Sequence, residues 1–178
     1  VCVTSANAVD IVRKLPQKQV VFLPDKNLGY WVQKSVPEKE LIIHQGGCIV
    51  HRQFTKEDVI KSREAHPGTK VIVHPECEPE VVDAADVVAS TAGMIKFVRE
   101  SPDKQFIIGT EEGHIHRLKK ERPDAEFFSV GSAKICVNMK KTRLSDLLAC
   151  LEQEKTEIIL DKDTIKNAIR PIEKMVAM

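Results

Sequence analysis

The sequence predicts an α/β protein in which parallel strands lie between layers of helices. Runs such as Val20–Leu23 and Val71–Val73 are apolar on both faces, as strands covered by helices on both sides must be. Amphipathic segments with helix-start signals fill most of the gaps between these runs. The 178 residues, 42% hydrophobic and 30% charged, have the composition of a globular protein with room for one or two domains.

A long internal repeat is the second observation that supports this architecture. Its segments keep one offset of 86 residues: 4–13 with 90–99, Gln19 with Gln105, and Glu40 with Glu126. Such an unbroken offset over about 37 positions indicates two copies of one strand-helix unit. The second copy also has an earlier strand and helix at 71–86, so we expect an equivalent pair before Val1. We therefore predict a partial domain at 1–50, a complete αβα domain at 51–141 and a separate tail at 142–178.

The individual elements follow from short apolar runs and from capping residues. Thr55 and Asp58 form a capping-box pattern before a helix over 55–65, which Pro67 and Gly68 end. In the tail we expect a helix over 144–153 and another from Asp163 that Pro171 interrupts. The predicted strands are 1–4, 19–23, 40–44, 70–74, 86–89, 105–109, 126–130 and 157–160.

Charge and cysteine content exclude several classes of function. The 27 basic and 26 acidic residues leave a net charge of +1, which predicts neither nucleic-acid binding nor a membrane surface. No apolar run approaches the roughly 18 residues that a membrane span needs. The five scattered cysteines form no C-x-x-C pair, which argues against a disulfide framework and favours a reducing compartment such as the cytoplasm.

Two short loops carry the residues that are the best candidates for catalysis or metal binding. Ligands of open parallel sheets bind beyond the carboxyl ends of the strands, where Cys48 with His51 and His74 with Glu76 are expected. An imidazole and a carboxylate two residues apart on an extended chain face the same way, as an acid–base pair requires. The alternatives are an ordinary strand-to-helix loop with a buried cysteine, and a buried histidine balanced by a carboxylate.

Hydroxyl residues at two helix starts are candidates for anion binding. Ser5, Ser90 and Thr91 follow predicted strands, where free backbone N–H groups bind carboxylate or phosphate. Simple helix capping uses the same geometry and stays an alternative. Asp25 and Glu111 occupy equivalent repeat positions and are predicted to be caps.

The other histidines and cysteines are assigned mostly structural roles. We expect His114 and His116 to be solvated on a basic surface helix, and Cys77 to be structural. Cys48 and Cys136 each follow the last strand of one repeat, so both could bind a metal or an iron–sulfur cluster, although their spacing alone does not say so.

Several motifs together resemble the quinolinate synthase family and occur in that family's order along essentially the whole chain. The resemblance rests on the segments T-S-A-N-A at 4–8, P-D-K-N-L-G at 24–29, G-C-I-V-H at 47–51, H-P-E-C at 74–77, S-T-A-G-M at 90–94, G-T-E at 109–111 and C-V-N-M-K-K at 136–141. Ala92 replaces a residue that is often glycine in the family.

The resemblance implies a fold, a reaction and a cofactor. It implies three related αβα domains around a pseudo-threefold axis, with the tail at 142–178 packing on an N-terminal domain that is absent here. The implied reaction condenses iminoaspartate with dihydroxyacetone phosphate to quinolinate, a precursor of the nicotinamide cofactors. L-aspartate oxidase or dehydrogenase would supply the imine. A [4Fe–4S] cluster, with one open iron that acts as a Lewis acid, would be held by one cysteine from each domain.

Residue roles also follow from the resemblance. By motif, Cys48 and Cys136 match two cluster ligands, whereas Cys2 does not fill the third place. His74 and Glu76 would move protons, and His51 would hold substrate near the open iron. Ser5, Ser90 and Thr91 would bind phosphate or carboxylate groups.

Two other functions stay open at this point. A non-catalytic fragment would bind phosphorylated metabolites or dock to a separate N-terminal chain. A metal-dependent hydrolase would use His51, His74 and Glu76, although the H-E-x-x-H spacing of such enzymes is missing.

Overall fold

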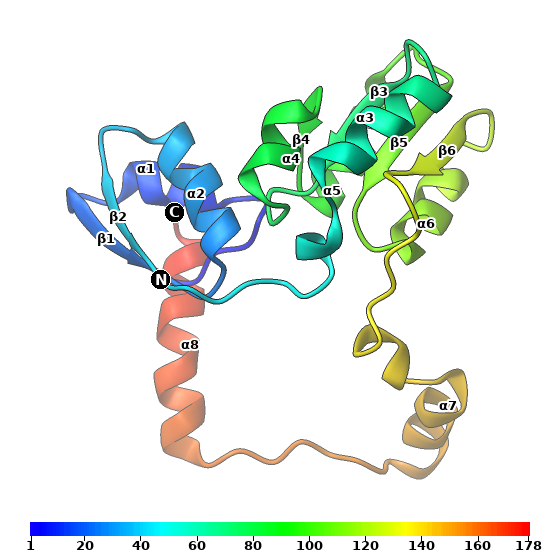
Figure 1. The fold of residues 1–178 in the computed structure, drawn as a ribbon. Coiled ribbons are helices and arrows are strands. Elements are labelled where there is room, and N and C mark those ends of the chain that lie inside the picture. The colour runs from blue at the N-terminus through cyan, green and yellow to red at the C-terminus, as the bar shows by residue number, and fades with distance from the viewer. The chain divides into compact units, whose positions relative to one another are not determined.

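The computed structural model describes residues 1–178 and contains two parallel sheets, so the predicted α/β class is confirmed (Figure 1). The pseudo-threefold arrangement of domains stays a prediction. In chain order the elements are α1 (Ala8–Lys14), β1 (Gln19–Phe22), α2 (Lys26–Ser35), β2 (Glu40–Ile43), the 3₁₀-helix η1 (His51–Gln53), α3 (Lys56–Ala65), β3 (Lys70–Val73), α4 (Pro79–Ala84), β4 (Val87–Val88), α5 (Thr91–Glu100), β5 (Gln105–Gly109), α6 (Gly113–Glu121), β6 (Glu126–Ser129), the 3₁₀-helix η2 (Met139–Lys141), α7 (Leu144–Gln153) and α8 (Lys162–Val176).

The larger sheet has four strands in the order β4-β3-β5-β6, with helices on both faces. Alternate strand residues enter opposite cores because successive side chains of a strand point to opposite faces. Val71 and Ile107 pack in one core with residues of α3 and α4. Ile72 and Phe106 pack in the other with residues of α5 and α6. The result is a three-layer αβα arrangement, which explains why these strands are apolar on both faces.

The smaller sheet repeats the geometry of half of the larger one. Gln19 of β1 pairs with Glu40 of β2, and Gln105 of β5 pairs with Glu126 of β6. Both residues of the second pair lie 86 positions after those of the first, so the two strand pairs share one register. Helices α1 and α2 precede β1 and β2 just as α5 and α6 precede β5 and β6. The offset found in the sequence therefore corresponds to the same order of elements and the same strand pairing.

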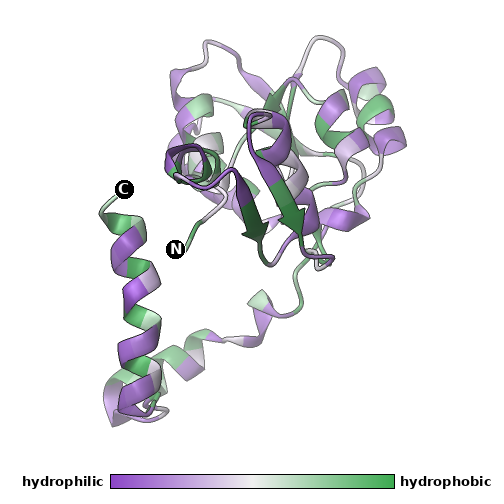
Figure 2. Ribbon diagram, turned by 90° about the vertical axis from the view of Figure 1, so that its left-hand side faces the viewer, coloured by the Kyte–Doolittle hydropathy of each residue, from purple (hydrophilic) through white to green (hydrophobic).

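One face of the β1–β2 sheet is apolar and exposed, and both strands turn from purple to the green of hydrophobic residues toward their arrowheads in Figure 2. Val21 and Ile42 have 64% and 49% of their surface exposed. At the equivalent position of the second repeat, Ile107 is fully buried. The two repeats thus differ in how their sheets are covered.

Two predicted strands are wrong. Residues 1–4 and 157–160 form no strand. A strand forms only where a neighbour accepts and donates its ladder hydrogen bonds, and these apolar runs have none. The strand predicted over 86–89 is shortened to Val87–Val88, and the other strands lie within one residue of their predicted ends.

Helix boundaries follow local capping. Thr55 accepts a hydrogen bond from the Asp58 N–H while the Asp58 carboxylate accepts one from the Thr55 N–H, so the predicted capping box of α3 is confirmed. The predicted interruption at Pro171 is wrong, because α8 runs through it. An internal proline removes its own N–H bond and its ring crowds the carbonyl four residues earlier, which bends a helix without having to end it.

The chain divides into two compact units. One is Thr4–Ile135, which contains both sheets, and the other combines Val1–Val3 with Cys136–Met178. Within the second unit the Cys2 N–H donates to the Pro171 carbonyl at 3.0 Å. The domain limits 1–50, 51–141 and 142–178 stay a prediction. All helices are too short or too polar to cross a membrane.

Candidate functional site

Four loops of the Thr4–Ile135 unit converge at the carboxyl edge of the larger sheet. His74 follows β3, Ser90 follows β4 and Thr110 follows β5. His51, in the 3₁₀-helix after β2, contacts the same edge through its ring. Parallel strands end at one edge, so residues distant in the sequence meet there.

His51 is the centre of the cluster. Its Nδ1 lies 3.1 Å from Glu76 Oε2 and its Nε2 lies 2.9 Å from Thr110 Oγ1. Burial alone would lower the pKa of His51, but the hydrogen bonds with Cys48 and Glu76 outweigh it and raise the pKa to about 9. His51 is therefore a cation near neutral pH that donates to both oxygen atoms.

His74 stacks on His51 and is neutral. The ring centroids are 4.3 Å apart and the planes differ by 13°. Burial, reinforced by the positive charge on His51, lowers the pKa of His74 to about 4. Its Nδ1 accepts the Glu76 N–H at 3.3 Å, so the proton lies on Nε2, which is 3.2 Å from the Ser5 hydroxyl. Both predicted acid–base residues are present, but no hydrogen bond joins their side chains: Glu76 Oε2 is 3.8 Å from His74 Nδ1.

Glu76 and Cys48 are the two acidic groups of the site. The hydrogen bond from His51 holds the pKa of Glu76 below its usual range, although partial burial opposes this. A hydrogen bond with the same imidazole lowers the pKa of the Cys48 thiol. Both residues line an open hollow of about 320 Å³, so the acidic side of the site is accessible.

The start of α2 fixes the two loops that carry these groups. Asp25 is buried, and its Oδ1 accepts the Leu28 N–H at 2.8 Å while its Oδ2 accepts the Cys48 N–H at 2.8 Å. Asn27, 2% exposed, donates from Nδ2 to the Glu76 carbonyl at 3.0 Å. One helical turn thus restrains both the cysteine loop and the glutamate loop.

We expect Asp25→Ser to loosen the Cys48 loop while α2 stays capped. The serine hydroxyl replaces the cap to Leu28, but it has no second oxygen for Cys48. Loss of a charged hydrogen bond of about 1.5–3 kcal/mol predicts amide exchange at Cys48 at least about tenfold faster. Hydrogen exchange by NMR measures this.

The Leu28 amide is the internal control and should keep its protection. Asp161→Ser changes the N-cap of α8, which accepts from the Thr164 N–H, and should leave the Cys48 amide unaffected. Unchanged exchange at Cys48 in Asp25→Ser would contradict the restraint.

The three hydroxyl residues differ in position. Ser90 caps α5 through a hydrogen bond from the Gly93 N–H at 3.1 Å, and Thr91 is the exposed first residue of that helix. Ser5 is not the cap of α1, whose N-cap position is Asn7. Ser5 instead lies against His74, which connects the first repeat to the cluster.

Several structural assignments can be compared with the predictions. Asp25 is a cap as predicted, and Glu111 accepts from the N–H of Gly113, the first residue of α6. Cys77 is buried in the core, and burial raises its pKa to about 12. The prediction for His114 is wrong: its Nε2 is buried without a hydrogen-bond partner, and burial lowers its pKa.

Cys136 belongs to the other compact unit. Its backbone carbonyl accepts the Lys140 N–H at 3.2 Å, and it is half-buried. A shared cluster held by Cys48 and Cys136 stays a prediction.

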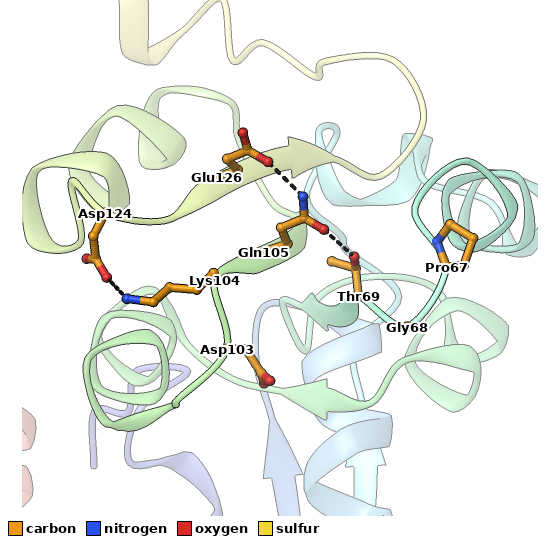
Figure 3. A pocket seen from close by; sticks show the side chains of 8 residues that line it. All are labelled: Pro67, Gly68, Thr69, Asp103, Lys104, Gln105, Asp124 and Glu126. Atoms are coloured by element: carbon orange, nitrogen blue, oxygen red, sulfur yellow. Dashed lines mark hydrogen bonds and ion pairs between the residues drawn. The ribbon is translucent and has the colours of Figure 1, made fainter.

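A larger hollow of about 440 Å³ lies at the opposite edge of the sheet, between the starts of β3, β5 and β6 (Figure 3). Of its charged residues, Lys104 pairs with Asp124, and Asp103 accepts a hydrogen bond from the Ser101 hydroxyl. Gln105 donates a hydrogen bond from Nε2 to Glu126 at 2.7 Å and accepts one from the Thr69 hydroxyl at 3.4 Å. Because these groups satisfy one another, the cluster around His51 is the stronger candidate site.

Comparison with known proteins identifies the family. A family profile described as quinolinate synthetase A protein matches residues 1–177. The chain belongs to the quinolinate synthase family. The resemblance seen in the motifs is confirmed.

Curated quinolinate synthases match along nearly all of this chain. The enzyme of Thermodesulfovibrio yellowstonii is 46% identical over 177 residues, which cover 99% of this chain and 58% of that protein. The enzyme of Caldicellulosiruptor saccharolyticus is 46% identical over 175 residues, 98% of this chain and 58% of its own. That of Methanoregula boonei is 44% identical over 178 residues, 100% and 59% respectively. The chain thus spans less than two thirds of the length of these relatives.

Sequence reasoning missed two residues of the site. Thr110 follows the last residue of β5, and this position at the carboxyl edge was the available signal. Asn27 and Thr110 both lie in motifs that carry the family resemblance, at 24–29 and 109–111, but the sequence gave neither residue a role. The contact of Asn27 with Glu76 joins positions 49 apart and has no local pattern.

Proposed function

We propose that this chain carries part of the active site of a quinolinate synthase, which condenses iminoaspartate with dihydroxyacetone phosphate to quinolinate. The observation that supports this best is the convergence of Cys48, His51, His74 and Glu76 at one sheet edge, in a chain that belongs to the family. The cluster provides a cation, a carboxylate, a neutral imidazole and a thiol within one site.

The donor set is compatible with a [4Fe–4S] cluster. The Cys48 thiol is half-buried beside a cationic imidazole, which favours the thiolate that binds iron. Cys48 and Cys136 are the proposed ligands of this chain, and a third ligand is not assigned. When bound, the cluster supplies a Lewis acid at an iron with an open position.

The protein residues have distinct proposed roles. Glu76 is ionised and takes and returns protons during the tautomerisation and dehydration steps. The neutral His74 ring assists this proton transfer by donating a hydrogen bond from Nε2 to the reacting group. The positive charge of His51 attracts the carboxylates of the substrate. Ser5, with Ser90 and Thr91 at the start of α5, binds carboxylate or phosphate, since free N–H groups and the helix dipole favour an anion there.

The source of iminoaspartate and the cellular location of the protein are further proposals. Iminoaspartate is unstable in water, so an L-aspartate oxidase or dehydrogenase is proposed as its source. A reducing compartment, the cytoplasm, suits a protein whose cysteines serve as metal ligands.

Iron and sulfide analysis after anaerobic reconstitution tests the proposal. The experiment compares this chain with a version extended to the length of the curated relatives. We expect about four irons per protein in the extended version and loss of the cluster in Cys48→Ala and in Cys136→Ala.

Cys150→Ala is the matched control, because Cys150 is exposed on α7, and it should keep the cluster. A cluster that persists without Cys48 or Cys136 would refute the ligand assignment. A full cluster in the 178-residue chain would mean that another cysteine, such as Cys2, is a ligand.

A further inference from the structure

Three different metal-binding groups meet beside the hollow at the sheet edge. The Cys48 sulfur, a ring nitrogen of His51 and a carboxylate oxygen of Glu76 all lie within 4.8 Å of one another. Thiolate, imidazole and carboxylate are the ligands of Zn²⁺ in proteins. Two of them come from one short loop and the third from the loop after β3.

Each of these residues is held by a buried polar neighbour. Asp25 fixes the Cys48 backbone, and Asn27 fixes the Glu76 backbone. Thr110, 2% exposed, lies 2.9 Å from His51 Nε2, so Nδ1 is the nitrogen directed at Glu76. Outer contacts of this kind select the ring tautomer and orient ligands in metal sites.

The arrangement leaves room for a fourth ligand. Cys48 and Glu76 line the hollow of about 320 Å³, whereas His51 lies behind them and is 8% exposed. Three protein ligands with one accessible position describe zinc sites that keep a water or a substrate group. The bound ion would replace the protons that the three groups now share.

We propose that Cys48, His51 and Glu76 bind a single Zn²⁺ ion when no cluster occupies Cys48. The site lies within the Thr4–Ile135 unit and requires neither Cys136 nor residues outside this chain. It therefore goes beyond the proposed synthase function and does not depend on it. In an enzyme that does hold a cluster, zinc and the cluster exclude one another at Cys48.

Titration of the metal-free 178-residue chain with Co²⁺, followed by displacement with Zn²⁺, tests the proposal. Co²⁺ bound to a thiolate in a tetrahedral site gives a near-ultraviolet charge-transfer band and intense visible bands. We expect one ion per chain and loss of the charge-transfer band in Cys48→Ser. Glu76→Gln should weaken binding at least about tenfold, and Thr110→Val about 10–100-fold through the imidazole.

Matched controls separate this site from other thiols and carboxylates. Cys136→Ser and Glu78→Gln should bind Co²⁺ as the unchanged chain does. No thiolate band, a band that persists in Cys48→Ser, or a band lost in Cys136→Ser would overturn the proposal. Circular dichroism of each variant distinguishes lost binding from lost folding.

The outcome is separable from that of the synthase proposal. Cobalt binding without any cluster in the extended version would support the zinc site and refute the synthase assignment. A cluster in the extended version, with no cobalt binding to the 178-residue chain, would overturn the zinc site alone.

Discussion

Glu76→Gln is expected to lower kcat for quinolinate formation by about 10²–10⁴-fold, the usual contribution of a general acid or base. The glutamine amide has the size of the glutamate side chain and can still contact His51 Nδ1, which lies 3.1 Å from the Glu76 carboxylate in the unchanged protein. It cannot accept a proton during tautomerisation. The assay uses the version extended to the length of the curated relatives, with iron content measured in parallel.

The comparison with Glu78→Gln shows whether the effect is specific. Glu78 lies two residues further along and pairs with Lys26 and Arg52 at 3.6 and 3.2 Å. The Glu78→Gln substitution should leave kcat within about threefold, because Glu78 pairs with Lys26 and Arg52 and not with His51 or His74, and the amide oxygen can still accept hydrogen bonds from both basic groups. A Glu76→Gln enzyme with a complete cluster and nearly unchanged kcat would exclude Glu76 as the acid–base group. A change confined to KM would point to substrate binding instead.

The parts of the fold that the sequence predicted are those whose signals are local. Both ends of the strand 105–109 were predicted correctly. Phe106, Ile107 and Ile108 are buried on both faces of the sheet, so they form an unbroken apolar run in the sequence. The capping box at Thr55 is equally local. The strand predicted at 157–160 is wrong, because a strand also needs a neighbouring strand to pair with, and the residues of the strand itself do not specify that neighbour.

The candidate site shows the same limit. The loops that carry Cys48 and His74 were predictable as strand exits, since parallel strands place such residues at one edge. The partner of Glu76 was not. His74 is closer in sequence, but the carboxylate bonds to His51, 25 positions away, because the His74 Nδ1 already accepts the Glu76 N–H. Only the packing of one loop against another decides between the two imidazoles.

Ile107→Ala is expected to lower the free energy of unfolding by about 2–5 kcal/mol, since it removes apolar contacts and leaves a cavity. Ile107 has no exposed surface and packs with Val71, Val73 and other residues under α3 and α4. Val21 occupies the equivalent position of the first repeat but is 64% exposed. Val21→Ala should therefore cost less than about 1 kcal/mol, mostly through β-propensity.

Urea denaturation of the two variants measures this difference, provided that the dependence of the free energy on urea is unchanged. The two positions share strand geometry, because Gln19–Glu40 and Gln105–Glu126 pair in the same register. Backbone effects are therefore matched, and the extra methylene of isoleucine accounts for about 0.8 kcal/mol of the difference. The remainder reports how far helices cover each sheet face. Equal costs would show that the β1–β2 face is buried in solution, contrary to the exposure of Val21 and Ile42.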